Sequence, residues 1–419
     1  MRTTKYLLIL LIVLVPVGSS FAPEEPHEKS YTEIVVKGNN DFAFEVYSKL
    51  ADRQEGNMFL SPYSISTALA MTYAGARGRT ETQMADVLHF PTTVSAKPPS
   101  GSTGDQKQFH STFGTIVKAL NARGNKGAYE LTVANALWGQ KGYGFLREFL
   151  ELIEASYGGK LNEVDFRSAV ESARQRINAW VEKKTKGKIK DLIVKGLLSR
   201  MTRLVLTNAI YFKGNWASQF QEEETRNAPF TLLDGEKIDA PMMNQTGEFK
   251  YMETEDFQGL ELPYIDEELS MIIFLPKKFD GLGELEKTLT CENLSEWMAK
   301  LRKQKVIVSI PKFKMTSEFE LAEVLMSMGM TDAFSGSADF SGMNGKRDLF
   351  ISLVIHKAYV DVNEEGTEAA AATAVIINVT AVRPEPTPVF RADHPFVFVI
   401  RDNQSGSILF IGRVMNPKA

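Results

Sequence analysis

Five histidines are the first residues to test for chemistry: His27, His89, His110, His356 and His394. No two of them form a His-Glu-x-x-His zinc pair, and the chain has neither a Gly-x-Ser-x-Gly nucleophile elbow nor a Walker phosphate loop. Cys291 is the single cysteine, so an intrachain disulfide is excluded, and the sequence has no zinc-like Cys/His spacing. The sequence therefore predicts no catalytic residues, no metal and no cofactor, which argues against an enzyme.

Four polar residues stand out because they interrupt apolar runs. Ser61 and Ser64 flank a proline, Asn208 interrupts LVLTNAIYF, and His356 interrupts SLVIHKAYV. A buried polar group without a partner costs about 1–3 kcal/mol. The simplest solution is that these four side chains satisfy one another. The alternative is that each is paired locally.

A second unusual stretch, EEGTEAAAATAVIINVT, runs over residues 364–380. Gly366 has access to backbone angles closed to other residues, so it is expected to act as a hinge. Beyond it, alternate side chains are small and then apolar, as one face of a strand requires. The run of alanines also favours a surface helix or a linker. The segment is therefore predicted either to remain outside as a loop or to enter a sheet as a strand.

The rest of the chain predicts one large α+β domain, since strands and helices mix without βαβ alternation or repeats. Strand-like runs are expected at 130–137, 203–212, 269–275, 305–310, 357–362 and 395–400, and helical spacing at 42–50, 61–74, 109–120, 169–184, 292–303 and 319–328.

Length and charge narrow the class of protein further. The 419 residues carry a formal net charge of −4, so nucleic-acid binding is not expected. Residues 1–22 combine a positive start, an apolar run and a small-residue cleavage site, which predicts a secretory signal peptide. Residues 23–31 are polar and expected to be disordered. We expect a secreted, extracellular protein with no membrane association after signal removal.

Four stretches in this order resemble the serpin family: NMFLSPYSISTALAM, LVLTNAIYFKGNW, GTEAAAATA and ADHPFVFVIRDNQSGSILFIGRVMNP. The resemblance covers nearly the whole mature chain and includes a hinge of the inhibitory type. It implies a single serpin domain over residues 32–419, with a large central mixed β-sheet, further β-sheets and about eight or nine helices. It also implies an exposed reactive-centre loop at about 364–388, which inserts into the central sheet after cleavage.

The resemblance assigns roles to individual residues. Ser61, Ser64, Asn208 and His356 match the shutter, a hydrogen-bonded cluster beneath the point where the central sheet opens. Trp216 and Lys312 match the breach at the top of that sheet, where Lys312 is expected to pair with the first loop glutamate. The hinge would comprise Glu364, Glu365, Gly366, Thr367, Glu368, Ala369, Ala370, Ala371 and Ala372.

Counting seventeen positions from the first hinge glutamate places the reactive bond between Thr380 and Ala381, with Val379 and Val382 as alternatives. These small or β-branched residues favour an elastase-like or chymotrypsin-like serine protease. A subtilisin-like or cysteine protease is a further possibility. Arg383 is disfavoured as the specificity residue because a proline follows it.

The expected function is suicide inhibition of a serine protease, with a non-inhibitory carrier, chaperone or storage serpin as the alternative. Heparin binding is not expected, because four dispersed basic residues around one helix are too few for a footprint. The protein is expected to be a monomer that could polymerise through its own loop. The four basic residues that were considered for heparin are Lys107, Lys118, Arg123 and Lys126.

Four asparagines begin glycosylation sequons: Asn244, Asn293, Asn378 and Asn403.

Overall fold

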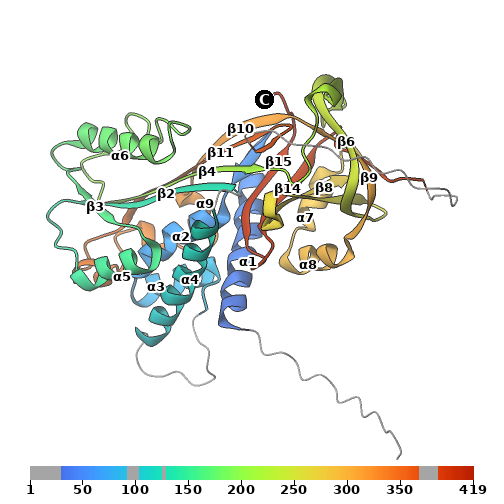
Figure 1. Cartoon of the computed structure of the whole chain (residues 1–419). Coiled ribbons are helices and arrows are strands. Elements are labelled where there is room, and N and C mark those ends of the chain that lie inside the picture. The colour runs from blue at the N-terminus through green and yellow to red at the C-terminus, as the bar shows by residue number, and fades with distance from the viewer. Residues whose placement is uncertain (1–29, 92–102, 125–128, 368–385) are drawn as a thin grey trace, which may run out of the picture.

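The computed structural model describes residues 30–91, 103–124, 129–367 and 386–419, which form one α+β domain (Figure 1). The described residues contain ten α-helices and two β-sheets. The helices are α1 Tyr31–Ala51, α2 Pro62–Tyr73, α3 Gly78–Leu88, α4 Thr103–Gly124, α5 Arg147–Tyr157, α6 Val170–Lys184, α7 Leu282–Lys287, α8 Cys291–Lys300, α9 Ala322–Ser327 and α10 Ser341–Asn344, with 3-10 turns at Glu222–Glu224, Ile265–Glu267 and Asp332–Phe334. None of these helices is long and apolar enough to cross a membrane.

The six-stranded sheet carries the site described below. Its order is β10-β11-β4-β2-β3, and the short β12 also pairs with β4. The sheet is mixed, because β11 and β4 run parallel whereas β12 and β2 are antiparallel to β4. The strands are β10 Phe313–Glu320, β11 Ile351–Val362, β4 Leu204–Asn215, β2 Tyr129–Gln140, β3 Leu161–Val164 and β12 Gly366–Thr367.

The second sheet has nine strands and packs beside the first (Figure 1). Its order is β1-β15-β14-β8-β7-β6-β9-β13, with β5 paired to β6. The strands are β1 Met58–Leu60, β15 Ile408–Val414, β14 Phe396–Asp402, β8 Leu269–Pro276, β7 Phe257–Pro263, β6 Lys237–Glu253, β9 Arg302–Pro311, β13 Val389–Arg391 and β5 Arg226–Thr231.

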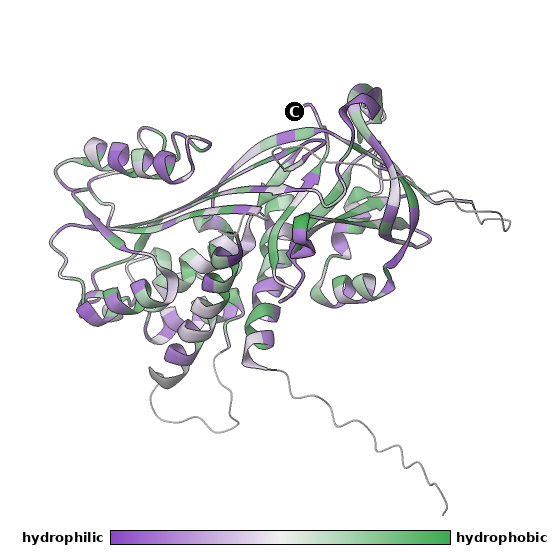
Figure 2. Ribbon diagram, viewed as in Figure 1, coloured by the Kyte–Doolittle hydropathy of each residue, from purple (hydrophilic) through white to green (hydrophobic). Residues whose placement is uncertain are grey.

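Both faces of the six-stranded sheet are covered, which explains the nearly continuous apolar run of β4. Leu206 and Ile210 point into the main core with α2, whereas Val205 and Ala209 point into a second apolar cluster beneath α6. Figure 1 shows α6 on one side of this sheet and α2 to α5 on the other, and Figure 2 shows hydrophobic residues along its strands. A strand in this sheet must therefore supply apolar side chains on both faces.

The structure corrects several expected boundaries. Tyr31 is not part of a disordered segment but the first residue of α1, because Ser30 and Glu33 form a reciprocal capping box. Phe319 belongs to β10, and the helix expected to start there is the short α9. Three helices of only four to six residues (α7, α9 and α10) bring the number to ten, above the eight or nine expected.

Candidate functional site

The four polar residues predicted to satisfy one another lie together where β4 and β11 of the six-stranded sheet meet the start of α2. All are fully buried. Ser61 caps the N-terminus of α2, and its backbone N–H donates to Nε2 of His356 at 3.1 Å. Nδ1 of His356 in turn hydrogen-bonds Oδ1 of Asn208, and the amide of Asn208 donates to Oγ of Ser64 at 2.7 Å. The predicted cluster therefore exists as a connected network.

Asn135 is a fifth member of this polar cluster that the sequence reasoning missed. Its Oδ1 accepts from the Asn208 amide at 2.6 Å and from the Ser64 hydroxyl at 3.2 Å. Its own amide donates to the backbone carbonyl of Ser64 at 3.1 Å. The sequence pattern could have identified Asn135, because it interrupts the strand-like run of residues 130–137 with a polar side chain, as Asn208 interrupts its own run.

His356 is neutral in the folded protein. Burial disfavours the charged ring and lowers its pKa from 6.5 to about 3, although its bond to Asn208 opposes this shift. The neutral state fits the hydrogen bonds, because Nε2 accepts from the Ser61 N–H and must carry no proton. Protonation would therefore break the contact between β11 and the cap of α2.

His356 and Asn208 face each other across the boundary between β11 and β4, which we call the seam. The two strands pair in parallel, with His356 opposite Asn208, and the pairing ends at Tyr359 opposite Tyr211. Beyond this last pair the two strands continue but no longer pair with each other. The seam is thus bridged by side chains in its middle and open at one end.

The open end is occupied by the first residues of the predicted hinge. β12 pairs with β4 in antiparallel register, Gly366 opposite Asn215 and Thr367 opposite Gly214. The turn before it is fixed by Trp216, whose backbone N–H donates to the Glu365 carbonyl at 3.0 Å. The indole Nε1 of Trp216 also donates to the Asn363 carbonyl at 3.0 Å. The chain that leaves β11 therefore turns back and begins a strand beside β4.

Gly366 is required by this arrangement. Its φ is +140°, and a Cβ at this position would lie 2.3 Å from the carbonyl oxygen of Gly214. Such a contact is far inside van der Waals distance, and the opposing atom is backbone that has little freedom to move. Any side chain here would push the start of β12 away from β4.

Lys312 and Glu364 form the expected ion pair, with Nζ and Oε2 2.7 Å apart. The other carboxylate oxygen of Glu364 accepts from the Thr225 hydroxyl at 2.7 Å. Burial of Glu364 alone would raise its pKa, but the hydrogen bonds from Lys312 and Thr225 outweigh it and lower the pKa from 4.5. Glu364 is only 4 % exposed, so the loop expected to be exposed from this residue is in fact buried at its start.

The rest of the predicted hinge, Glu368 to Ala372, and the candidate reactive residues 379–382 lie outside the described residues. So do Lys126 and the sequon at Asn378. Within the described ranges, no cluster of three or more His, Cys, Asp or Glu side chains could hold a metal ion. Arg123 is not a free surface cation, because it forms an ion pair of 2.8 Å with the fully buried Asp402.

The six-stranded sheet has two parallel strands, β4 and β11, with the short β12 paired to β4 beyond the end of their pairing. Comparisons with known proteins identify the family to which this fold belongs. The family model described as Serpin (serine protease inhibitor) matches residues 37–417. Human leukocyte elastase inhibitor is 45 % identical over 92 % of this chain and 100 % of its own length, and a serpin-like protein of Thermococcus kodakarensis is 45 % identical over 92 % and 86 %. The chain belongs to the serpin family.

Solved structures give the same result. Uncleaved ovalbumin is 33 % identical with a TM-score of 0.80, and the alignment covers 91 % of this chain and 100 % of that one. Human thyroxine-binding globulin complexed with thyroxine is 31 % identical with a TM-score of 0.82, over 93 % of this chain and 100 % of that one. The predicted fold, a single α+β serpin domain with a mixed sheet, is confirmed.

Proposed function

We propose that this protein inhibits serine proteases by offering the reactive-centre loop, at about residues 364–388, as bait and inserting the cleaved loop into the six-stranded sheet. The observation that carries the proposal is β12. Its two residues already pair with β4, in the direction a strand between β4 and β11 must run. The names of the similar proteins, among them leukocyte elastase inhibitors, support a serine protease as the target.

The covalent step involves the Thr380–Ala381 bond. The serine oxygen of the protease attacks the Thr380 carbonyl carbon, the peptide bond breaks, and the Ala381 amine leaves with a proton supplied by the protease. An ester then joins the protease to Thr380. The small residues at these positions favour an elastase-like or chymotrypsin-like enzyme.

The freed loop then extends β12 along the seam and draws the protease with it. About a dozen strand residues, at a net 0.5–1.5 kcal/mol per hydrogen bond plus apolar burial, supply the driving force. The parallel β4–β11 pairing and the contact between His356 and Asn208 oppose insertion, because both must be broken before a strand can enter. Insertion drags the protease away and distorts its active site before the ester can be hydrolysed, so the acyl-enzyme is trapped.

We also propose that residues 1–22 direct secretion, which places the target protease outside the cell. The apolar run of this segment and the small residues before Ala22 support this step. Expression of the full chain, followed by N-terminal sequencing of the exported protein, tests it. A start at or near Pro23 is expected, whereas retention of Met1 in an exported protein would contradict it.

Incubation with pancreatic elastase, chymotrypsin, trypsin and subtilisin tests the inhibitory proposal. Denaturing gels should reveal a stable adduct with at least one elastase-like or chymotrypsin-like enzyme, and mass spectrometry a released peptide that begins at Ala381. Cleavage of the loop without any adduct would contradict inhibition. That outcome would favour the alternative of a carrier, for which the similarity to thyroxine-binding globulin is the supporting observation.

A further inference from the structure

Three asparagines that begin glycosylation sequons lie within the described residues, and their side-chain amides are held differently. Asn244 is on β6, Asn293 is in the first turn of α8, and Asn403 follows β14. An asparagine amide nitrogen carries two hydrogens, and N-glycosylation replaces one of them with a bond to the sugar. The folded protein can therefore carry a glycan without losing a hydrogen bond only on an asparagine that has one N–H to spare.

Asn244 and Asn403 have no such N–H. The amide of Asn244 donates to two backbone carbonyl oxygens, both at 2.9 Å. The amide of Asn403 donates to the Glu267 carbonyl at 2.8 Å and to the Ser270 hydroxyl at 2.7 Å. Ser270 is fully buried, so a sugar on this nitrogen would have to enter the core. A glycan at either position would break a hydrogen bond of the folded protein.

Asn293 differs, because its amide makes a single hydrogen bond in the described part of the chain, to the Thr288 carbonyl at 2.7 Å. Its backbone N–H donates to the Thr290 hydroxyl at 3.1 Å, which caps α8 and fixes the position of this first turn. Asn293 is half-buried, and Ser295, the third residue of its sequon, is exposed. A sugar in place of the second amide hydrogen would leave both of these bonds intact.

A cavity beside Asn293 can hold the first sugar. It has a volume of about 570 Å³ and lies between α7, α8 and the paired ends of β7 and β8. Trp297, one helical turn beyond Asn293, lines it together with Phe257, and the two rings pack edge to face with centroids 4.8 Å apart. The other polar and charged lining residues are Glu255, Asp256, Lys277, Lys278, Glu284 and Thr288. An aromatic floor with a polar rim suits a sugar, whose C–H face is apolar and whose hydroxyls form hydrogen bonds.

This position is compatible with the proposed inhibition. Trp297 packs on Phe274 of β8, so α8 lies against the nine-stranded sheet and away from the seam between β4 and β11 (Figure 1). A glycan on Asn293 would leave the seam free. A glycan on Asn378, which is outside the described residues, would instead lie on the segment that is proposed to insert.

We propose that Asn293 is an N-glycosylation site of the exported protein and that its first sugar lies in the cavity over Trp297. In the transfer, the amide nitrogen of Asn293 attacks the anomeric carbon of a lipid-linked oligosaccharide. The new N–C bond replaces the bond from that carbon to the lipid phosphate, which leaves, and the amide gives up one proton to the transferase. The other N–H stays on the Thr288 carbonyl. The site rests on the proposed secretion, because the transferase acts on exported chains.

Expression of the full chain in a eukaryotic host that glycosylates secreted proteins tests the site. Mass spectrometry of the exported protein, before and after peptide N-glycosidase F, measures the glycan on each sequon peptide. We expect Asn293 to be occupied, and Asn244 and Asn403 to be occupied roughly tenfold less often, because each would lose a hydrogen bond. Ser295→Ala should abolish the glycan without altering the Asn293 amide, whereas the matched variant Ser295→Thr should keep it.

Two outcomes would overturn the assignment. An exported protein with an unmodified Asn293 would refute the site, and equal occupancy of the three asparagines would refute the role of the spare N–H. Residues 23–419 are also exported behind the host's own signal peptide. Export of this second chain alone would contradict the role of residues 1–22 in secretion, while the occupancy of Asn293 is still read.

The place of the first sugar is tested on the glycosylated protein. Endoglycosidase H, which leaves a single N-acetylglucosamine, should not change the melting temperature. Complete removal of the glycan should lower it by on the order of 2 °C, because the contact with Trp297 is lost. Asn293→Asp is the control for the aspartate that peptide N-glycosidase F leaves, and it should melt with the fully deglycosylated protein. Equal melting temperatures of the trimmed and the fully deglycosylated protein would refute the contact.

Discussion

The middle and the open end of the seam between β4 and β11 are held by different interactions. In the middle, the strands pair directly, and the fully buried His356 and Asn208 bridge them. At the open end, beyond Tyr211 and Tyr359, the contacts to β12 are made by backbone groups around a glycine. Backbone pairing accepts any compatible strand, whereas a side-chain network requires particular partners. The open end of the seam is therefore suited to the entry of a new strand, and the polar cluster in the middle opposes its further insertion.

The largest expected effect comes from Thr367→Arg, which places a long charged side chain on β12 where it pairs with Gly214. Burying an unpaired charge costs several kcal/mol, so insertion should fail after cleavage. The protease adduct is expected to disappear and the loop to be cleaved as a substrate, as a denaturing gel would show. A full yield of adduct would mean that the strand does not enter at β12.

A smaller effect is expected from Gly366→Ala. The added Cβ would lie 2.3 Å from the Gly214 carbonyl oxygen, and the strain should slow insertion by roughly tenfold or more. Gly283→Ala is the matched control, since a Cβ at Gly283 has no atom within 4 Å. The ratio of adduct to cleaved inhibitor measures the effect. Equal ratios for the two variants would mean that the close packing of Gly366 against β4 has no part in loop insertion.

His356→Leu tests the middle of the seam. It leaves the Ser61 backbone N–H and the side-chain Oδ1 of Asn208 without the partner that His356 supplies, which should lower the free energy of unfolding by roughly 2–5 kcal/mol. Urea denaturation measures this loss. Uptake of a synthetic peptide with the sequence of residues 367–379, followed on a native gel, should become faster in this variant and not in His110→Leu, which alters a buried histidine on α4, away from the seam. Equal uptake by both variants would contradict a role for the polar cluster in resistance.

Acid should lower the free energy of unfolding through His356 and through the second buried histidine, His110. Burial lowers the pKa values of His356 and His110 to about 3, so below pH 6.5 the unfolded chain binds more protons than the folded one. Their contribution is fully present above pH 6.5 and declines toward pH 3, by about 1.4 kcal/mol per pH unit for each histidine. Urea titrations at pH 7 and pH 5 measure it. If the free energy of unfolding changed with pH in His356→Leu as it does in the wild type, the assignment of a neutral His356 in the folded protein would be contradicted.

The smallest effect is expected from Lys312→Gln. The pair with Glu364 is partly exposed on the lysine side, so its loss should change stability by only about 0–1 kcal/mol and less at high salt. Backbone bonds at Trp216 should still hold the turn. A thermal melt in low and high salt measures the effect. A loss of inhibition as large as that of Thr367→Arg would mean that the ion pair, and not the backbone, fixes the start of β12.

The sequence predicted the middle of the seam better than its open end. Asn208 and His356 interrupt apolar runs, and burial forces such groups to find partners, so their meeting follows from composition and pattern. The burial of Glu364 and Gly366 depends on the register of β12 with β4, about 150 residues earlier in the chain. Local pattern carries no information about such a distant pairing.

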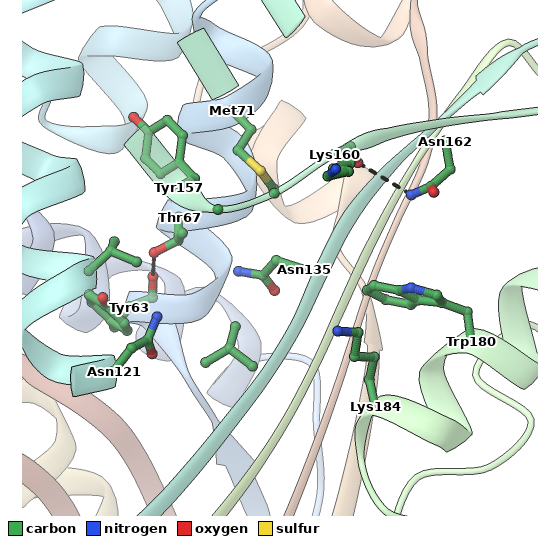
Figure 3. Close-up of a pocket in the computed structure, with 14 residues that line it drawn as sticks. Tyr63, Thr67, Met71, Asn121, Asn135, Tyr157, Lys160, Asn162, Trp180 and Lys184 are labelled. Carbon is green, nitrogen blue, oxygen red and sulfur yellow. Dashed lines mark hydrogen bonds between the residues drawn. The ribbon is translucent and has the colours of Figure 1, made fainter. Parts of the chain in front are cut away.

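Two local signals were present but not recognised. The Ser30 and Glu33 capping box starts α1 eleven residues before the apolar pattern suggested. Asn135 interrupts β2 as Asn208 interrupts β4, and the same burial argument would have placed it in the polar cluster. The cavity that Asn135 lines beside β2 (Figure 3) had no sequence signature, because it arises where β3 stops pairing with β2.

The most direct test of the account is to lock the seam. Ile210 and Ala358 are opposite each other in the parallel β4–β11 pair, close enough for a disulfide when both become cysteine. The native Cys291 is buried and burial raises its pKa well above 9, so it should not interfere. The oxidised double variant should be cleaved by the target protease without forming an adduct, and reduction should restore the adduct. Adduct formation by the oxidised protein would contradict entry between β4 and β11.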